Sequence, residues 1–193
     1  MPSNIIFKTT DFSCLLKCGR CTFTKVNGQQ CKNRVCFGTP VCWIHTKQLY
    51  GLRIKPSTVY EGKGLFTERL IAADTWICPY IGELINEQCL NLRYPGDMTA
   101  PYVIATDNSD YIDSACTRGI GSMSNGKFKN DGFSQSLRSH NAIIDTRDTN
   151  ELWLKSTKNI HARHEIFVYY GTEYHLEDTH VTKRTSGDDT RPC

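Results

Sequence analysis

Four short segments of this chain hold residue types that bind small molecules and position reacting groups. A glycine pair around one residue lets the backbone take up positive φ and come close to a ligand. An asparagine amide and a phenol hydroxyl each both donate and accept hydrogen bonds. In chain order the segments are Gly62-Lys63-Gly64-Leu65-Phe66, Tyr80-Ile81-Gly82-Glu83, Asn125 followed by Asn141-Ala142, and Glu165 to Gly171 with Tyr170.

Each segment alone also fits an ordinary structural role. A Gly-x-Gly pair is usually a turn, and asparagine is a common turn residue. Tyr80 fits a half-buried strand position, and Tyr170 fits a packing position near the end of a strand. It is the order of the four segments that favours a single site.

In this order the segments resemble the SET-domain protein lysine methyltransferases, which transfer a methyl group from S-adenosylmethionine to a lysine amine without a metal in the chemistry. The resemblance implies that Gly62-Lys63-Gly64 holds the methionine part of the cofactor through main-chain groups. It implies that Asn125 and Asn141-Ala142 form the second wall of the cofactor site. Tyr170 matches the catalytic tyrosine, and Tyr80 is expected to line the lysine channel.

The family's reaction is an in-line displacement at a sulfonium methyl, so holding amine, carbon and sulfur in line supplies most of the catalysis. The nucleophile is a neutral lysine amine, whose ordinary pKa of about 10.4 leaves little of it at neutral pH. Desolvation in an aromatic channel beside a positive sulfonium lowers that pKa, so no general-base carboxylate is required. Val168 stands where many members have Phe or Tyr, and Ile144 supplies no phenol, which predicts room for more than one methyl.

Two departures from the family pattern bear on activity. Ser122 stands where the family typically has an arginine, and Gly126 follows Asn125 where it has a histidine. Arg163 and His164 stand where a Gly-Glu turn is common. Two interpretations therefore stay open: an active enzyme, or a SET fold kept as a binding or structural component, such as a virion protein, after the site decayed.

A cysteine cluster near the N-terminus indicates metal chemistry. Of the ten cysteines, six fall between Cys14 and Cys42. Cys21, Cys31, Cys42 and His45 are separated by nine, ten and two residues. Zinc takes four such ligands in a tetrahedron. The spacing resembles the three-cysteine, one-histidine zinc motif of some plant growth regulators, so we expect a structural zinc ion on these four residues.

The ligand set has alternatives. Cys18 with Cys21 also makes a Cys-x-x-Cys pair, and Cys14 and Cys36 lie close in sequence. Free buried thiols and disulfides are the other interpretations. A structural metal suits the module, because about 40 residues cannot build a sufficient core unaided. The module also carries the basic residues Lys25, Lys32, Arg34 and Lys47. These residues either form a solvated surface or contact nucleic acid or an acidic partner.

Composition is that of an ordinary globular protein. The 193 residues, 39% hydrophobic and 22% charged, allow one core and a small appendage. No apolar run approaches the roughly 20 residues that span a bilayer, so no membrane partner is expected. The N-terminus is too polar for a secretory signal. These features predict an intracellular protein of the nucleus or cytoplasm, and the net charge of +3 permits nucleic-acid contact without implying it.

Short runs broken by turn residues predict a mainly β domain with short helices, an α+β class. Expected strands lie near residues 64–66, 75–82, 102–106, 111–113, 142–145 and 152–155, with a helix over 83–92. The resemblance adds a C-terminal segment that threads under a preceding loop as a pseudoknot. The expected domains are a cysteine-rich zinc module at 1–50, a linker at 51–58, a SET domain at 59–176 and a polar tail at 177–193.

The favoured hypothesis is a methyltransferase acting on a protein substrate with an exposed lysine, such as a histone-like or other basic tail. A small SET domain joined directly to such a zinc module looks like proteins of large DNA viruses, which would place it in a host nucleus or a virion and make a viral protein a candidate substrate. A zinc-dependent nucleic-acid adaptor is the weakest of the hypotheses.

Overall fold

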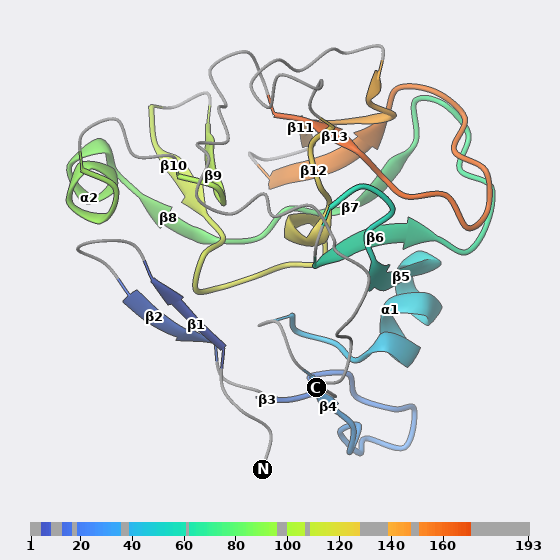
Figure 1. Cartoon of the computed structure of the whole chain (residues 1–193). Helices are drawn as coiled ribbons and strands as arrows, with labels where there is room; N and C mark the ends of the chain where they lie inside the picture. Colours follow the sequence, from blue (N-terminus) through green and yellow to red (C-terminus); the bar gives the residue numbers. More distant parts are fainter. Residues whose placement is uncertain are drawn as a thin grey trace.

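The computed structural model describes residues 5–8, 13–16, 19–35, 39–60, 62–95, 100–106, 109–127, 139–147 and 151–170. Within these ranges the fold is mostly short strands with two short α-helices, which confirms the predicted class. Figure 1 shows the strands gathered into several small sheets rather than one large sheet. The packing between these sheets therefore holds the chain together.

A four-stranded sheet forms one side of the domain, with the strand order β13-β11-β12-β7. Every second residue of β12 is buried, as Leu152, Leu154 and Ser156 show, so one face of this sheet covers the core. β11 pairs antiparallel with β12 but parallel with β13, which brings the end of the described chain beside β11. The strands are β7 (Trp76–Pro79), β11 (Ala142–Arg147), β12 (Glu151–Ser156) and β13 (Val168–Tyr169).

A three-stranded antiparallel sheet lies at the left of Figure 1, with the order β8-β10-β9. Its strands are β8 (Glu83–Ile85), β9 (Val103–Ala105) and β10 (Tyr111–Asp113). The helix expected over residues 83–92 is shorter, because β8 occupies its first residues. α2 (Glu87–Arg93) begins after Asn86, whose side chain accepts a hydrogen bond from Cys89 N at 2.9 Å and caps the helix.

The stretch expected as a linker, residues 51–58, is mostly a strand. β5 (Leu52–Pro56) pairs antiparallel with β6 (Lys63–Thr67) over its full length. Leu52 is fully buried, so this strand contributes to the core. The apolar residues at its start were the signal that the linker prediction overlooked.

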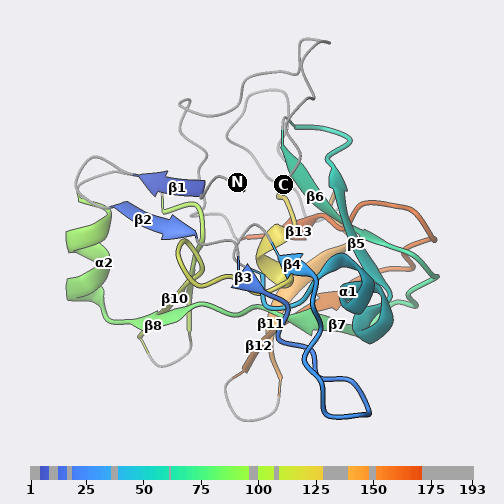
Figure 2. The same ribbon diagram turned by 90° about the horizontal axis from the view of Figure 1, so that it is seen from below.

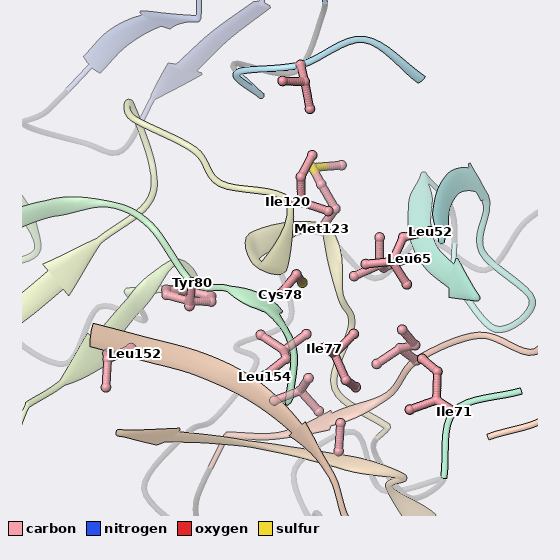
Figure 3. Close-up of a cluster of buried hydrophobic side chains, with 14 of the residues drawn as sticks. Leu52, Leu65, Ile71, Ile77, Cys78, Tyr80, Ile120, Met123, Leu152 and Leu154 are labelled. Atoms are coloured by element: carbon pink, nitrogen blue, oxygen red, sulfur yellow. The ribbon is translucent and has the colours of Figure 1, made fainter. Parts of the chain in front are cut away.

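The core is centred on the 3-10 turn η1 (Gly121–Met123). Figure 3 shows Ile120 and Met123 at this turn, between Cys78 of β7 and Leu65 of β6. Seen from below in Figure 2, η1 lies between the β8–β10 region and the β5–β6 pair. The turn therefore joins the small sheets around one buried cluster.

The N-terminal module consists of short strands and one helix. Helix α1 (Trp43–Tyr50) begins directly after Cys42. The dipeptide Asn27-Gly28 lies in a tight turn, with Gly28 at φ +78° and Gly28 N donating to the Lys25 carbonyl. The remaining strands are β1 (Ile5–Lys8), β2 (Ser13–Leu16), β3 (Gly19–Arg20) and β4 (Arg34–Val35).

The last described segment, residues 165–170, lies between the η1 loop and β11. Val168 N donates to the Asn125 carbonyl at 2.9 Å, and Phe167 O accepts from the backbone N–H groups of Asn141 and Ala142. The polar tail and any further threading of the chain concern residues 171–193, which lie outside the described residues. Among the described helices none combines the length and the hydropathy that crossing a membrane requires.

Candidate active site and metal centre

Tyr170 ends β13 with its hydroxyl against the η1 loop. The hydroxyl donates to the Ser124 carbonyl oxygen at 2.9 Å, and Ser124 Oγ lies 3.4 Å from the same phenol oxygen. Burial raises the pKa of Tyr170 to about 12, although the hydrogen bond to Ser124 opposes the rise. The phenol is therefore protonated at neutral pH. It can orient a reacting group, but it is not a base.

Asn125, the next residue along, joins this loop to the glycine pair. Its amide nitrogen donates to the Lys63 carbonyl at 3.1 Å and to Glu165 Oε1 at 3.0 Å. Both amide hydrogens are therefore used inside the protein. The amide oxygen Oδ1 accepts no hydrogen bond from any described residue, so it is the group of Asn125 that can receive a ligand donor.

A buried carboxylate, Glu165, ties three segments together. It accepts hydrogen bonds from Ser57 Oγ at 2.8 Å, Thr58 N at 2.7 Å, Thr58 Oγ1 at 2.6 Å and Asn125 Nδ2 at 3.0 Å. The Glu165 residue is only 4% exposed. Among the described residues it has no cationic partner, so these donors stabilise its charge. This role of Glu165 was not predicted from the sequence.

The two glycines of the pair differ in what surrounds them. A Cβ atom on Gly64 would lie 2.1 Å from Glu165 Oε1, so the protein's own carboxylate occupies the space beside Gly64. Gly62 has φ +99°, and a Cβ there would meet nothing within 4 Å. The close approach to a ligand expected of both glycines is therefore available at Gly62, while Gly64 makes room for Glu165.

Asn141 and Ala142 hold the last strand. Asn141 Nδ2 donates to the Glu165 carbonyl at 2.9 Å, and its Oδ1 accepts from Phe167 N at 2.9 Å. The backbone N–H groups of both residues donate to Phe167 O. Because these groups already have partners, the two residues position the segment that carries Glu165 and Tyr170. Direct cofactor contact by them stays a prediction.

Tyr80 lies on the other side of η1, beside the start of β9. Its ring is buried and its hydroxyl donates to the Tyr102 carbonyl at 3.0 Å. Tyr170 packs against the same buried core cluster to which Tyr80 belongs. The structure thus brings Tyr80 and Tyr170 to one aromatic corner, where a lysine channel is expected.

The two departures noted at Ser122 and Gly126 have local explanations. Ser122 is buried and donates to the Gly119 carbonyl at 2.9 Å, so it needs no further partner. Beside Gly126, the buried His140 ring accepts from Lys127 N at 2.8 Å through Nε2. The His140 imidazole therefore holds this loop through its hydrogen bond with Lys127, although the sequence lacks a histidine directly after Asn125.

The predicted metal ligands form a compact, buried group. The ligand atoms of Cys21, Cys31, Cys42 and His45 all lie within 4.8 Å of one another. In a tetrahedral zinc site the ligand atoms are about 3.5–3.8 Å apart. His45 Nδ1 faces both Cys21 Sγ at 3.4 Å and Cys42 Sγ at 3.3 Å. The arrangement therefore fits a zinc ion with little rearrangement.

The surroundings of the cysteines favour thiolate at Cys42. Burial works against ionisation, but hydrogen bonds from the Asn33 side chain and from nearby backbone N–H groups lower the pKa of Cys42 to about 6. Asn33 N also donates to Cys31 Sγ at 3.4 Å, and Cys42 N donates to Cys21 Sγ at 3.2 Å. Hydrogen bonds of this kind, donated to the ligand atoms by neighbouring groups, orient the ligands of metal sites.

The structure does not describe the side chains of the three cysteines proposed as alternative ligands. Cys18 and Cys36 lie outside the described residues, and for Cys14 only the backbone is described. Cys78 and Cys89 are free thiols far along the chain, and burial raises the pKa of the Cys78 thiol. The three-cysteine, one-histidine set is thus the one that the described residues bring together.

Comparison with known proteins agrees with this geometry. Residues 62–171 match the family described as SET domain, which covers more than half of the chain. No curated protein matches the chain. The matched residues begin at the glycine pair and end just after Tyr170. The chain therefore belongs to the SET-domain family, whose members are generally protein lysine methyltransferases.

Proposed function

We propose that this protein is an S-adenosylmethionine-dependent protein lysine N-methyltransferase. One observation carries the proposal: an unbroken series of contacts links the glycine pair to the tyrosine. Asn125 bonds the Lys63 carbonyl, and its neighbour Ser124 bonds the Tyr170 hydroxyl. Residues more than a hundred positions apart in sequence are thereby held around one location.

The residues present fit the cofactor. Gly62 offers open backbone, and Asn125 Oδ1 offers an acceptor suited to an ammonium donor. When bound, S-adenosylmethionine supplies an electrophilic methyl group on a positively charged sulfur. Gly62, Lys63 and Asn125 would hold it.

The tyrosines orient the acceptor. Tyr170 keeps its proton, which the Ser124 carbonyl holds in a fixed direction. The phenol oxygen would fix the direction of an incoming amine without removing its proton. Burial among Tyr80, Tyr102 and Tyr170 disfavours a charged ammonium and so favours the neutral nucleophile. Positioning and desolvation are the contributions that this site makes.

The zinc ion is proposed as structural. Its four ligands are all buried protein side chains, a closed set with no position left for substrate. Helix α1, which carries His45, is followed directly by Gly51 and by β5, which pairs with β6 of the matched SET region. Zinc binding would therefore stabilise the module and fix α1 against β5. The division into zinc module, SET domain and tail stays part of this proposal.

A second candidate function is that of a SET-fold protein that serves as a binding or structural component and does not catalyse a reaction. The observation that favours it is the carboxylate beside Gly64, which fills space that a ligand would otherwise use. In that case the open backbone at Gly62 would offer too little contact area to bind the cofactor. Measured cofactor affinity separates the two candidates.

The test is methyl transfer by the zinc-loaded full chain. S-adenosylmethionine with a labelled methyl group is incubated with lysine peptides, and incorporation is measured by mass spectrometry. Tyr170→Phe should reduce kcat by about a hundredfold or more, because it removes an oriented hydroxyl at the reacting centre. Its unchanged melting temperature would show that the fold is intact. Absence of cofactor binding, together with no turnover on any lysine peptide, would favour the structural candidate.

The setting and acceptor rest on the sequence resemblance. Histone-like or viral protein lysines, and a nuclear or virion location, stay predictions. A nucleic-acid partner for the basic module would show as binding that weakens steeply with salt. Binding that is insensitive to salt would exclude that partner.

A further inference from the structure

A buried arginine beside the aromatic corner has no carboxylate partner among the residues that the structure describes. Arg118 is only 9% exposed, yet within these ranges its single hydrogen bond runs from Nε to the Ala115 carbonyl at 3.3 Å. Its guanidinium lies over the Tyr102 ring, 4.1 Å from the ring centroid. Buried arginines are nearly always paired, because removing an unpaired charge from water is costly. Stacking on a phenol compensates only part of that cost.

Nearby carboxylates are engaged elsewhere. Asp113 forms an ion pair with Arg93 at 2.8 Å and accepts from Ala115 N at 2.8 Å. Among the described residues no carboxylate forms an ion pair with Arg118. Its two Nη atoms are neither hydrogen-bonded to a described residue nor sealed from solvent. Because a guanidinium is always charged in proteins, an anion from outside the described residues would complete its pairing.

The surroundings of Arg118 indicate which ligand supplies the anion. Tyr102, whose ring lies beneath the guanidinium, accepts the Tyr80 hydroxyl at its carbonyl oxygen, so Arg118 lies beside the tyrosine proposed to line the lysine channel. The side chain of Asn125, proposed to face the cofactor, is instead hydrogen-bonded to Lys63 and Glu165, and the one described hydrogen bond of Arg118 goes to Ala115. The acceptor side of the site is therefore the side that faces the free guanidinium.

We infer that Arg118 is a specificity-determining residue that binds a carboxylate next to the acceptor lysine. This inference rests on the proposed methyltransferase function and deepens it. An acidic side chain flanking the lysine would form a charge-assisted, bidentate pair with the two Nη atoms. A basic neighbour would meet an uncompensated positive charge. The acceptor would then be a lysine in an acidic context, in contrast to the basic tail expected from the resemblance.

The experiment uses the zinc-loaded full chain saturated with S-adenosylhomocysteine and three sets of peptides. The peptides are identical except that the residue beside the lysine is Glu, Gln or Arg. Dissociation constants come from fluorescence anisotropy, and kcat/KM values come from a parallel methylation assay. We expect the Glu peptides to bind about tenfold more tightly than the Gln peptides, and the Arg peptides to bind most weakly.

Variants assign the preference to one side chain. Arg118→Gln should abolish the difference between Glu and Gln peptides, and Arg118→Lys should retain part of it. The charge-matched control, Lys25→Gln, removes a positive charge from an exposed turn of the zinc module and should keep the preference. If Arg118→Gln does not fold, a second measurement uses the native chain. It follows how the preference for Glu over Gln peptides changes with salt concentration. Its loss with rising salt supports the inference, and its persistence opposes it.

Each outcome has one meaning. Methylation without any preference for Glu peptides overturns the inference and leaves the proposed function standing. Preferential binding of Glu peptides without methylation overturns the proposed function and supports the anion site. A tenfold loss of S-adenosylhomocysteine affinity in Arg118→Gln, measured without peptide, would assign the arginine to the cofactor carboxylate and overturn the inference. Absence of both binding and methylation overturns both.

Discussion

Replacing Glu165 by glutamine tests whether one buried carboxylate assembles the cofactor side of the site. The substitution keeps the shape of the side chain and removes its charge. A carboxamide nitrogen in place of Oε2 would face the Thr58 backbone N–H, now at 2.7 Å, and the Thr58 hydroxyl, now at 2.6 Å. The hydroxyl can rotate, but the backbone N–H cannot.

The magnitude follows from these contacts. A hydrogen bond to a charged group contributes about 1.5–3 kcal/mol, and the bonds from Ser57 and Asn125 also weaken when their acceptor becomes neutral. We therefore expect Glu165→Gln to lower the free energy of unfolding by about 2–3 kcal/mol. Because Asn125 loses its anchor, the affinity for S-adenosylhomocysteine should fall by about tenfold, equivalent to about 1.4 kcal/mol.

Urea unfolding and calorimetric titration measure the two quantities. Glu151→Gln is the matched control, since that carboxylate is exposed on β12 and bonds only the Trp153 indole. The control should change stability by less than about 0.5 kcal/mol. A Glu165→Gln protein as stable as this control, with unchanged ligand affinity, would refute the reasoning.

Zinc removal by a strong chelator should lower the melting temperature. Cys31→Ser should reduce the zinc content, whereas Cys89→Ser, at a free thiol outside the cluster, should leave one zinc per chain. Equal zinc content in both variants would contradict the assigned ligands. The free energy of unfolding should decline above pH 10. Burial raises the pKa of Tyr170 to about 12 in the folded state, so this phenol ionises first in the unfolded chain. The stability that it contributes is fully present below pH 10 and is lost as the pH rises through 12. Tyr170→Phe should show a shallower decline in alkaline denaturation curves, and an identical decline would argue against a buried phenol. Prolonged methylation should give di- or trimethyllysine by mass spectrometry, since Val168 is small and fully buried, and Val168→Phe should shift the product toward monomethyl. Monomethyl product alone from the native chain would contradict the prediction that the pocket has room for more than one methyl group.

The sequence predicted those features that depend on local residue types. The zinc ligands were recognisable because their spacing and chemistry suffice, and the structure brings the four together. Most strands were found from alternating apolar residues, β12 being the clearest case. The helix expected from Glu83 was placed too early, because β8 pairs with β10 at those residues and only tertiary contact reveals that pairing.

The roles of Glu165, His140 and Arg118 were not predictable from the sequence. Each depends on a partner distant in the chain: Glu165 on Thr58, His140 on Lys127, and Arg118 on Tyr102. A single polar residue gives no periodic signal, and its burial is set by the sheets packed around it. The same limit explains Gly64, whose need for glycine comes from Glu165 and not from a ligand.

Calorimetric titration of the zinc-loaded chain with S-adenosylhomocysteine tests the methyltransferase assignment most directly. The account predicts saturable binding with one site per chain, weakened when Asn125 is changed to alanine, because the Oδ1 acceptor and the bond to Lys63 are then lost. No heat of binding at millimolar ligand, from a chain that retains its zinc and its cooperative unfolding, would contradict it.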